Sequence, residues 1–247
     1  MTTETILSPT NEEDVAEILR SAKGPISVRG SATRHVPRPG VPLTTRNLAG
    51  VQLYEPGALT LVVRAGTPVS EIDALLKQNN QRLPFEPMDH RPLLGTRGEP
   101  TIGGLIGLNH CGPRRLQAGS ARDLLLGVRM VDGSGRIIKN GGRVMKNVTG
   151  YDLARLNCGA RGTLGIVTEI SLKVLPLPEV TMTLALNVND PEQAVRDMAV
   201  ALGSPFDITG AAWDGGRVLL RVEGFADSVR YRADRLKELL PGAAESE

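Results

Sequence analysis

Small residues and arginines follow the first buried segment of the chain. The stretch ISVRGSATRHVPRPG spans residues 26–40, and its apolar, β-branched part ends at Arg29. The small residues that follow leave backbone N–H groups accessible, and such a run of amides can surround phosphate oxygens. Arg34 could neutralise the remaining phosphate charge. An ordinary polar loop after a strand is the alternative interpretation, and this stretch alone does not decide between them.

A second segment, TIGGLIGLNHCG, combines glycines with apolar residues and begins at Thr101. Gly103, Gly104 and Gly107 would allow a ligand to approach the backbone closely, although tight packing also favours glycine. Two such segments together suggest a large ligand that is held by the main chain. Neither contains G-x-G-x-x-G or G-x-x-x-x-G-K-[ST], which disfavours a nicotinamide-dependent enzyme and a P-loop nucleotidase.

Polar residues precede a predicted strand in GSARDLLLGVRMV. Ser120, Arg122 and Asp123 come directly before its apolar part. Arg122 and Asp123 either pair with each other or contact a ligand, and the sequence leaves both interpretations open.

Another polar group, Lys146, Asn147, Tyr151 and Asp152, lies in the stretch RVMKNVTGYDLARLNCG. A structural interpretation is favoured here. Leu153 and Leu156 have helical spacing, which predicts a short packed helix with polar caps.

The histidines and cysteines do not form a metal-binding pattern. His35, His90 and His110 are isolated in loop-like segments, and each is predicted to be a surface or supporting residue. Cys111 and Cys158 match no metal-ligand spacing, so we expect reduced thiols, no disulfide and no bound metal.

The composition predicts a folded protein that does not bind nucleic acid. The 247 residues are 40% hydrophobic, enough for a substantial core in one large or two modest domains. The 29 basic and 27 acidic residues give a net charge of only +2, and aromatic residues make up 3%. A basic surface and stacking side chains for nucleic acid are therefore not expected. No apolar run could span a membrane and the N-terminus lacks a signal-peptide pattern, so we expect a cytoplasmic location.

The elements that position these residues can be outlined from hydrophobic spacing. A helix is predicted after Thr10, whose capping box includes Glu13, and a second helix after a cap at Thr67. Strands are predicted at 25–29, 41–51, 59–66, on both sides of the Gly-Ser-Gly turn at 133–135, and as a pair in 162–178. The proline-rich residues 83–100 are predicted to be irregular or a subdomain junction.

The pattern changes after Pro178. Strand 181–188, helix 191–202, hairpin 208–224 and helix 228–240 follow one another, with Asp190 as a helix cap and Trp213 in a hairpin core. This order predicts a small α+β layer that lacks a closing strand.

Several motifs occur together in the order of a known flavoprotein family. VRGSATR, TIGGLIGLN, GSARDLLLGVRMV, MKNVTGYDL and GTLGIVTEISLKVLP resemble the PCMH-type FAD-binding fold over residues 1–178. AGTPVSEIDALL, GPRR and VMKNVTGYDLARL are similar to the FAD-binding subunits of bacterial glycolate oxidases. The resemblance implies an α+β fold with subdomains at about 1–90 and 91–178, followed at 179–247 by a partial, ferredoxin-like cap.

The resemblance also implies a set of residues that bind FAD. The loop after the first strand would surround the pyrophosphate, and the second glycine segment would line the dinucleotide. Of two further segments, one would lie near the flavin half and the other would run alongside the cofactor through its own main-chain contacts. These residues are Arg29, Gly30, Ser31, Ala32, Thr33, Arg34, Thr101, Gly103, Gly104, Gly107, Ser120, Arg122, Gly165, Ile166 and Val167.

In relatives a histidine of the phosphate loop attaches the flavin covalently, whereas Ser31 and Ala32 occupy the corresponding positions here. The resemblance therefore implies non-covalent FAD. It implies oxidation of a 2-hydroxy acid such as glycolate, in which a base removes the hydroxyl proton and hydride passes to the flavin. The sequence does not identify the base.

The implied partners are a second FAD subunit and an iron–sulphur subunit, through which the chain would be cytoplasmic or peripheral to the inner face of the membrane. Chains of this family usually continue beyond the point where this sequence ends and complete the cap. The substrate pocket of this chain is therefore expected to be open to solvent, shared with a partner, or missing. A companion flavoprotein that only relays electrons or supports assembly is therefore one alternative, and a non-redox binding module is another.

Overall fold

The computed structural model describes residues 6–34, 38–143 and 150–246, which form two compact units. Unit 1 contains the described residues up to Cys111 and Ser120–Leu175, and unit 2 contains Gly112–Gly119 and the described residues from Pro176. The predicted domains, 1–178 and 179–247, differ from these units mainly at residues 112–119. That residues 1–178 and 179–247 are separate domains stays a prediction.

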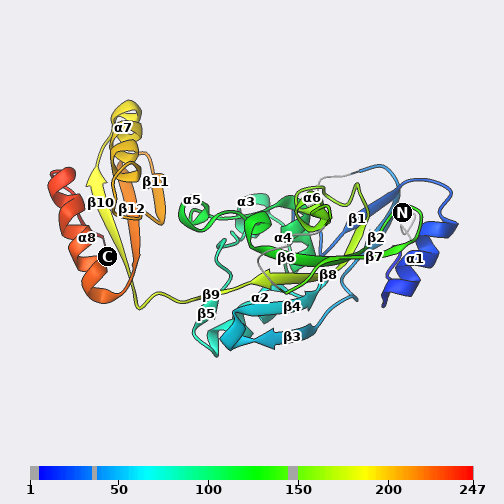
Figure 1. Cartoon of the computed structure of the whole chain (residues 1–247). Coiled ribbons are helices and arrows are strands. Elements are labelled where there is room, and N and C mark those ends of the chain that lie inside the picture. The colour runs from blue at the N-terminus through cyan, green and yellow to red at the C-terminus, as the bar shows by residue number, and fades with distance from the viewer. Residues whose placement is uncertain (1–5, 35–37, 144–149, 247) are drawn as a thin grey trace. The chain divides into compact units, whose positions relative to one another are not determined.

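Unit 1 is built on a five-stranded antiparallel sheet with the order β3-β4-β8-β6-β7 (Figure 1). Its strands are β3 (Val51–Glu55), β4 (Thr60–Arg64), β6 (Leu125–Val131), β7 (Ile137–Gly141) and β8 (Ile166–Lys173). The predicted hairpin around the Gly-Ser-Gly turn is present as β6 and β7. A strand pair was expected at 162–178, but β8 is one continuous central strand because no turn-forming residue interrupts IVTEISLK.

Three helices share one apolar core with this sheet: α2 (Val69–Lys77), α4 (Ile102–Leu108) and α6 (Leu153–Asn157). Ile72 of α2 and Ile106 of α4 are fully buried in it, together with Ile170 of β8. In α6 the buried residues are Ala154 and Asn157. The predicted short helix is therefore correct, but Leu156 is 59% exposed and does not form its packed face.

The N-terminal part of unit 1 consists of α1 (Glu12–Ser21) and a parallel pair, β1 (Ile26–Arg29) with β2 (Val41–Thr44). The cap of α1 is Asn11, whose side chain accepts a hydrogen bond from Asp14 N at 2.8 Å. The predicted capping box with Thr10 and Glu13 is wrong by one residue, because Thr10 donates to the Asp14 carboxylate instead.

Thr67 does not cap α2. Pro68 is the residue that precedes this helix, and Thr67 Oγ1 donates to Arg64 O at 2.7 Å while it accepts from Gly50 N at 3.0 Å. The predicted cap is wrong because the hydroxyl closes a turn after β4.

Short elements complete unit 1. They are η1 (Pro56–Ala58), β5 (Gln81–Arg82), α3 (Arg91–Leu94), η2 (Ala121–Leu124) and β9 (Leu175–Pro176), which pairs with β5 at the end of the unit. The residues 83–100 contain only α3 and are otherwise irregular, as predicted.

Unit 2 is a four-stranded antiparallel sheet with the order β11-β12-β10-β13. Its elements are α5 (Arg115–Ala118), β10 (Val180–Asn187), α7 (Pro191–Leu202), β11 (Gly210–Trp213), β12 (Arg217–Gly224), α8 (Ala226–Leu239) and β13 (Ala244–Glu245). The βαββα prediction is confirmed, and Asp190 caps α7. A closing strand was not expected, but the two-residue β13 pairs with β10 in that position.

Candidate functional site

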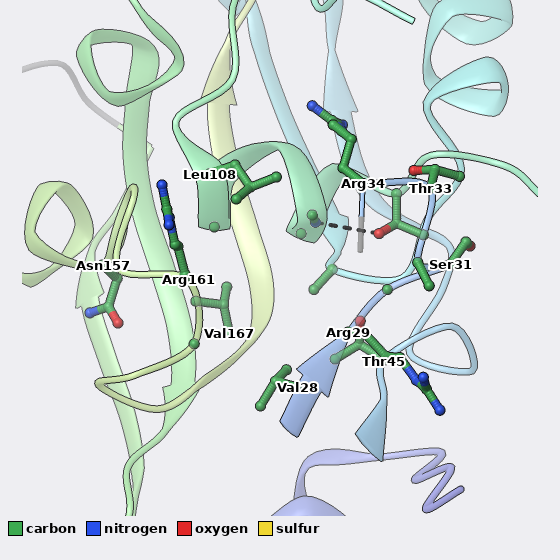
Figure 2. A pocket seen from close by; sticks show the side chains of 18 of the residues that line it. Val28, Arg29, Ser31, Thr33, Arg34, Thr45, Leu108, Asn157, Arg161 and Val167 are labelled. Carbon is green, nitrogen blue, oxygen red and sulfur yellow. Dashed lines mark hydrogen bonds between the residues drawn. The ribbon is translucent and has the colours of Figure 1, made fainter. Parts of the chain in front are cut away.

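A large open pocket lies within unit 1, with a volume of about 1040 Å³ that includes solvent at its mouth. Three segments line it: the loop after β1, the first turns of α4, and the chain from α6 into β8. Figure 2 shows Ser31, Thr33 and Arg34 on one side and Asn157 and Arg161 on the other. The lining residues are Val28, Arg29, Gly30, Ser31, Ala32, Thr33, Arg34, Arg38, Thr45, Ala65, Thr101, Gly103, Gly104, Gly107, Leu108, Asn157, Arg161, Gly162, Gly165 and Val167.

Hydrogen bonds to the turn after β4 fix the start of α4. Gly103 N donates to Ala65 O at 2.8 Å, and Ile102 N donates to Thr67 O at 3.0 Å. A β-carbon on Gly103 would lie 2.7 Å from Ala65 O, so only glycine permits this approach. Thr101 caps the helix by accepting from Gly104 N at 3.3 Å, the bond drawn in Figure 2.

The loop after β1 lies against the start of α4. A β-carbon on Gly30 would be 2.2 Å from Thr101 Oγ1, which means that the two segments touch where Gly30 has no side chain. Gly30 O also accepts from Thr44 Oγ1 at 2.9 Å, which holds the loop on β2. Ala32 has a left-handed backbone with φ 54°, an uncommon conformation for a residue other than glycine. The two small-residue segments singled out in the sequence therefore meet in one pocket.

The opposite wall is attached to the end of α4. Gly159 N donates to Ile106 O at 2.9 Å, and Arg161 N donates to Gly107 O at 2.8 Å. Arg38 Nη1 then donates to Arg161 O at 3.0 Å. The end of the short helix α4 thus positions this wall of the pocket through its backbone carbonyls, whereas the loop after β1 lies against the side chain of its cap, Thr101.

The pocket is lined by positive charge. Among the described residues that line it there are four arginines and no aspartate or glutamate, and these arginines are Arg29, Arg34, Arg38 and Arg161. Burial lowers the pKa of the Arg34 guanidinium, an effect that the nearby Asp89 charge opposes. Arg34 Nη1 is buried without a hydrogen-bond partner. Unpaired buried donors are rare, so this arrangement fits an anionic ligand.

Twelve of the expected ligand residues line the pocket, and three do not. Ser120 is buried and forms a capping box with Asp123 on η2, through bonds of 2.8 Å from its N and Oγ to Asp123 Oδ2. Arg122 is exposed, and its backbone N donates to Asn109 Oδ1. Ile166 is buried in the core that contains Val15 of α1. A role of these three in cofactor binding stays a prediction.

Asp123 therefore uses its carboxylate for Ser120 and not for a hydrogen bond with Arg122. Hydrogen bonds from the backbone and side chain of Ser120 lower the pKa of Asp123, and this effect exceeds that of its partial burial. The pairing of Arg122 with Asp123, one of the two interpretations left open, is therefore not found, because the Asp123 carboxylate accepts from Ser120 instead.

Sequence reasoning missed eight lining residues, which are Val28, Arg38, Thr45, Ala65, Leu108, Asn157, Arg161 and Gly162. Arg161 and Gly162 belong to CGARGTLG, whose small residues carry the same signal as the first two segments. No local signal marks Thr45 or Ala65, because they reach the pocket only through strand pairing.

Other polar residues have local roles or lie outside the described part. Asp152 caps α6 by accepting from Arg155 N at 2.9 Å, and Tyr151 is 88% exposed. His35, Lys146 and Asn147 lie outside the described residues. Within the part of the chain that the structure describes, no group of three histidine, cysteine or acidic side chains could hold a metal ion, and no helix is long and apolar enough to cross a membrane.

The chain belongs to the family of PCMH-type FAD-binding domains, since the family model described as FAD binding domain matches residues 3–141. Glycolate oxidase subunit GlcE of Escherichia coli (strain K12) is 38% identical over 225 residues, which are 90% of this chain and 61% of that protein. Glycolate oxidase subunit GlcD of Bacillus subtilis (strain 168) is 33% identical, over 79% of this chain and 43% of its own length. These relatives are longer than the chain, which spans less than two thirds of each.

A mitochondrial D-lactate dehydrogenase [cytochrome] of Arabidopsis thaliana is 29% identical over 92% of this chain and 38% of that protein. Among solved structures, an alkyldihydroxyacetonephosphate synthase matches with a TM-score of 0.76 and 17% identity, over 97% of this chain and 51% of the other. At this identity the likeness concerns the fold alone, which is the α+β fold expected from the sequence.

Proposed function

We propose that the pocket of unit 1 holds FAD without a covalent bond. The observation that carries this proposal is the contact of the Gly30 loop with the capped start of α4, in a pocket whose described lining has four arginines and no acidic residue. Backbone amides and guanidinium groups are suitable donors for a diphosphate.

The proposed ligand residues are the twelve expected residues that line the pocket, together with Arg38 and Arg161. Gly30, Gly103 and Gly104 would let the diphosphate approach the backbone, while the arginines would balance its charge. When bound, FAD would supply the capacity to accept a hydride equivalent from a substrate.

Non-covalent binding is proposed because the loop residues 29–34, RGSATR, contain no histidine. Precipitation of the purified protein with acid tests this point. Flavin in the supernatant is expected, and flavin that stays with the pellet would contradict non-covalent attachment.

We further propose that the protein containing this chain oxidises a 2-hydroxy acid such as glycolate, as one subunit of a larger enzyme. Support comes from the names of the relatives, which are glycolate oxidase subunits and a D-lactate dehydrogenase. The proposed partners are a second FAD subunit and an iron–sulphur subunit. The proposed location is the cytoplasm or, through these partners, the inner face of the membrane.

An anaerobic titration of the purified, flavin-containing protein with glycolate or D-lactate tests this activity. Bleaching of the flavin absorbance by the chain alone would support turnover at its own flavin. A flavin that stays oxidised until the partner subunits are added would instead support a companion subunit that relays electrons or stabilises the assembly. Two of the relatives are named as subunits, which supports the companion subunit as a second proposed function.

A further inference from the structure

Asn157 lines the pocket of unit 1 with a side chain that is almost closed to solvent. It is the last residue of α6 and is 5% exposed. Among the described residues that line the pocket, it has the single amide side chain. In Figure 2 the amide nitrogen of Asn157 points away from Ser31 and Thr33 on the opposite wall, and the oxygen lies on the nearer side.

Hydrogen bonds fix this orientation of the amide. Asn157 Nδ2 donates to Leu153 O at 2.8 Å and to Met130 Sδ at 3.1 Å. A carbonyl oxygen and a thioether sulphur can only accept, so the nitrogen and not the oxygen must face them. Asn157 Oδ1 accepts no hydrogen bond from the part of the chain that the structure describes. Its lone pairs are therefore available to a ligand in the pocket.

The amide oxygen restricts which part of a ligand can lie against it. Asn157 Oδ1 can only accept, so the ligand must supply a donor. Ionised phosphate and carboxylate groups offer only acceptor oxygens, which excludes the diphosphate of FAD as the partner. The donors of FAD are its hydroxyl groups and two ring N–H groups, the flavin N3–H and the adenine 6-amino group. The hydroxyls can also accept from the guanidinium and backbone donors of the pocket, whereas a ring N–H requires an acceptor.

We propose that Asn157 Oδ1 accepts a hydrogen bond from a ring N–H of bound FAD and thereby contributes to the specificity of the pocket for this cofactor. Gly162 and Gly165, from the segment that follows α6, line the same pocket, and without side chains they leave room for a flat ring. This inference rests on the proposed function and deepens it, because it assigns a residue that recognises a ring of the cofactor.

The binding of FAD and two analogues to the full chain, after removal of its flavin, tests this hydrogen bond. 3-Methyl-FAD lacks the flavin N–H, and an analogue with purine in place of adenine lacks the 6-amino group. Isothermal titration calorimetry measures the three dissociation constants. We expect one analogue to bind about fivefold or more weakly than FAD, as for a lost hydrogen bond, and the other to bind like FAD. The weaker analogue identifies the ring that faces Asn157.

Substitutions then show whether Asn157 causes this difference. Asn157→Leu should weaken FAD binding about fivefold or more and abolish the difference between FAD and the weaker analogue. Loss of the contacts with Leu153 and Met130 affects both ligands alike, so the comparison isolates the proposed bond. Asn140→Leu is the matched control, because Asn140 Oδ1 also binds the α6 backbone, at 2.8 Å from Leu153 N, but does not line the pocket. This variant should retain the difference, and circular dichroism verifies that each variant is folded.

Three results would overturn this role of Asn157. The first is an equal dissociation constant of FAD and both analogues for the unchanged chain, a measurement that needs no variant. The second is a folded Asn157→Leu protein that retains the full difference, and the third is loss of the difference in Asn140→Leu as well. A chain that binds none of the three flavins would reject the proposed function itself. A chain that binds FAD but gives one of the three results would reject only the role of Asn157, so the two failures are distinguishable.

Discussion

Thr101 Oγ1 occupies the space that a side chain on Gly30 would need, because a β-carbon there would lie 2.2 Å away. The same oxygen accepts the hydrogen bond from Gly104 N that caps α4. One atom thus joins the loop after β1 to the start of α4, and a change at Gly30 should affect both.

Gly30→Ala is expected to lower the FAD content of the purified protein at least tenfold. The added methyl group must displace Thr101 Oγ1, which removes the helix cap and separates the two segments; loss of a cap costs about 1 kcal/mol. Flavin absorbance per protein measures the effect. Gly57→Ala is the matched control, since a β-carbon there meets no atom within 4 Å and Gly57 lies outside the pocket. Normal flavin content in Gly30→Ala would contradict this account of the pocket.

Arg114→Ala is expected to destabilise unit 2 by about 3 kcal/mol, the lower end of the cost of breaking a buried ion pair. Arg114 Nη1 lies 3.0 Å from Glu223 Oε2, and both side chains are less than 10% exposed. Arg221, at 3.3 Å from Glu223 Oε1, remains as a partner and limits the loss. Chemical unfolding measures the free energy.

The exposed pair of Arg217 with Asp214 provides the comparison for Arg114, because both of its side chains are at least 40% exposed. Arg217→Ala should change the free energy of unfolding by less than about 1 kcal/mol. An equal effect of the two substitutions would show that burial does not determine the strength of the Arg114 pair.

The stability of unit 1 should fall in acid through Glu12. Burial raises the pKa of this carboxyl, but hydrogen bonds from Arg129 and Thr168 and the charges of Arg129 and Arg64 outweigh it, so its pKa is below the usual 4.5. A lowered folded-state pKa stabilises the fold above the unfolded-state value, and this contribution disappears as the pH falls through the folded-state pKa. Free energies of unfolding between pH 7 and pH 3 should therefore decrease less for Glu12→Gln. Parallel curves for the two proteins would exclude this role of Glu12.

Cys158 should resist thiol reagents in the folded protein. It is 8% exposed, and burial raises the pKa of its thiol to about 12, so almost no reactive thiolate exists at pH 8. Cys111 is more exposed and should react first. Mass spectrometry after labelling would locate the modified residue, and denaturation should make both available. Rapid labelling of Cys158 in folded protein would contradict the buried environment.

The sequence by itself determined the elements whose signals are local. The hairpin of β6 and β7, the helix α7 with its Asp190 cap and the small-residue loop after β1 were predicted, because turn chemistry, capping and side-chain size depend on adjacent residues. The glycine-rich segment at Gly103 was also singled out, but its helix α4 was not predicted. The order of these motifs was sufficient to identify the family, which the match over residues 3–141 confirms.

Only the tertiary structure decided which distant residues share a surface. Arg161 is held at the pocket by the bond from its backbone N to Gly107 O of α4, and the Arg38 guanidinium donates to Arg161 O. The Arg114–Glu223 pair joins residues 109 positions apart within unit 2. Ser120 was expected near the ligand but is used in a capping box. Such contacts depend on how distant parts of the chain pack together, which local sequence patterns do not show. A serine can either cap a helix or bind a ligand, so the residue type alone does not predict which of these roles it has.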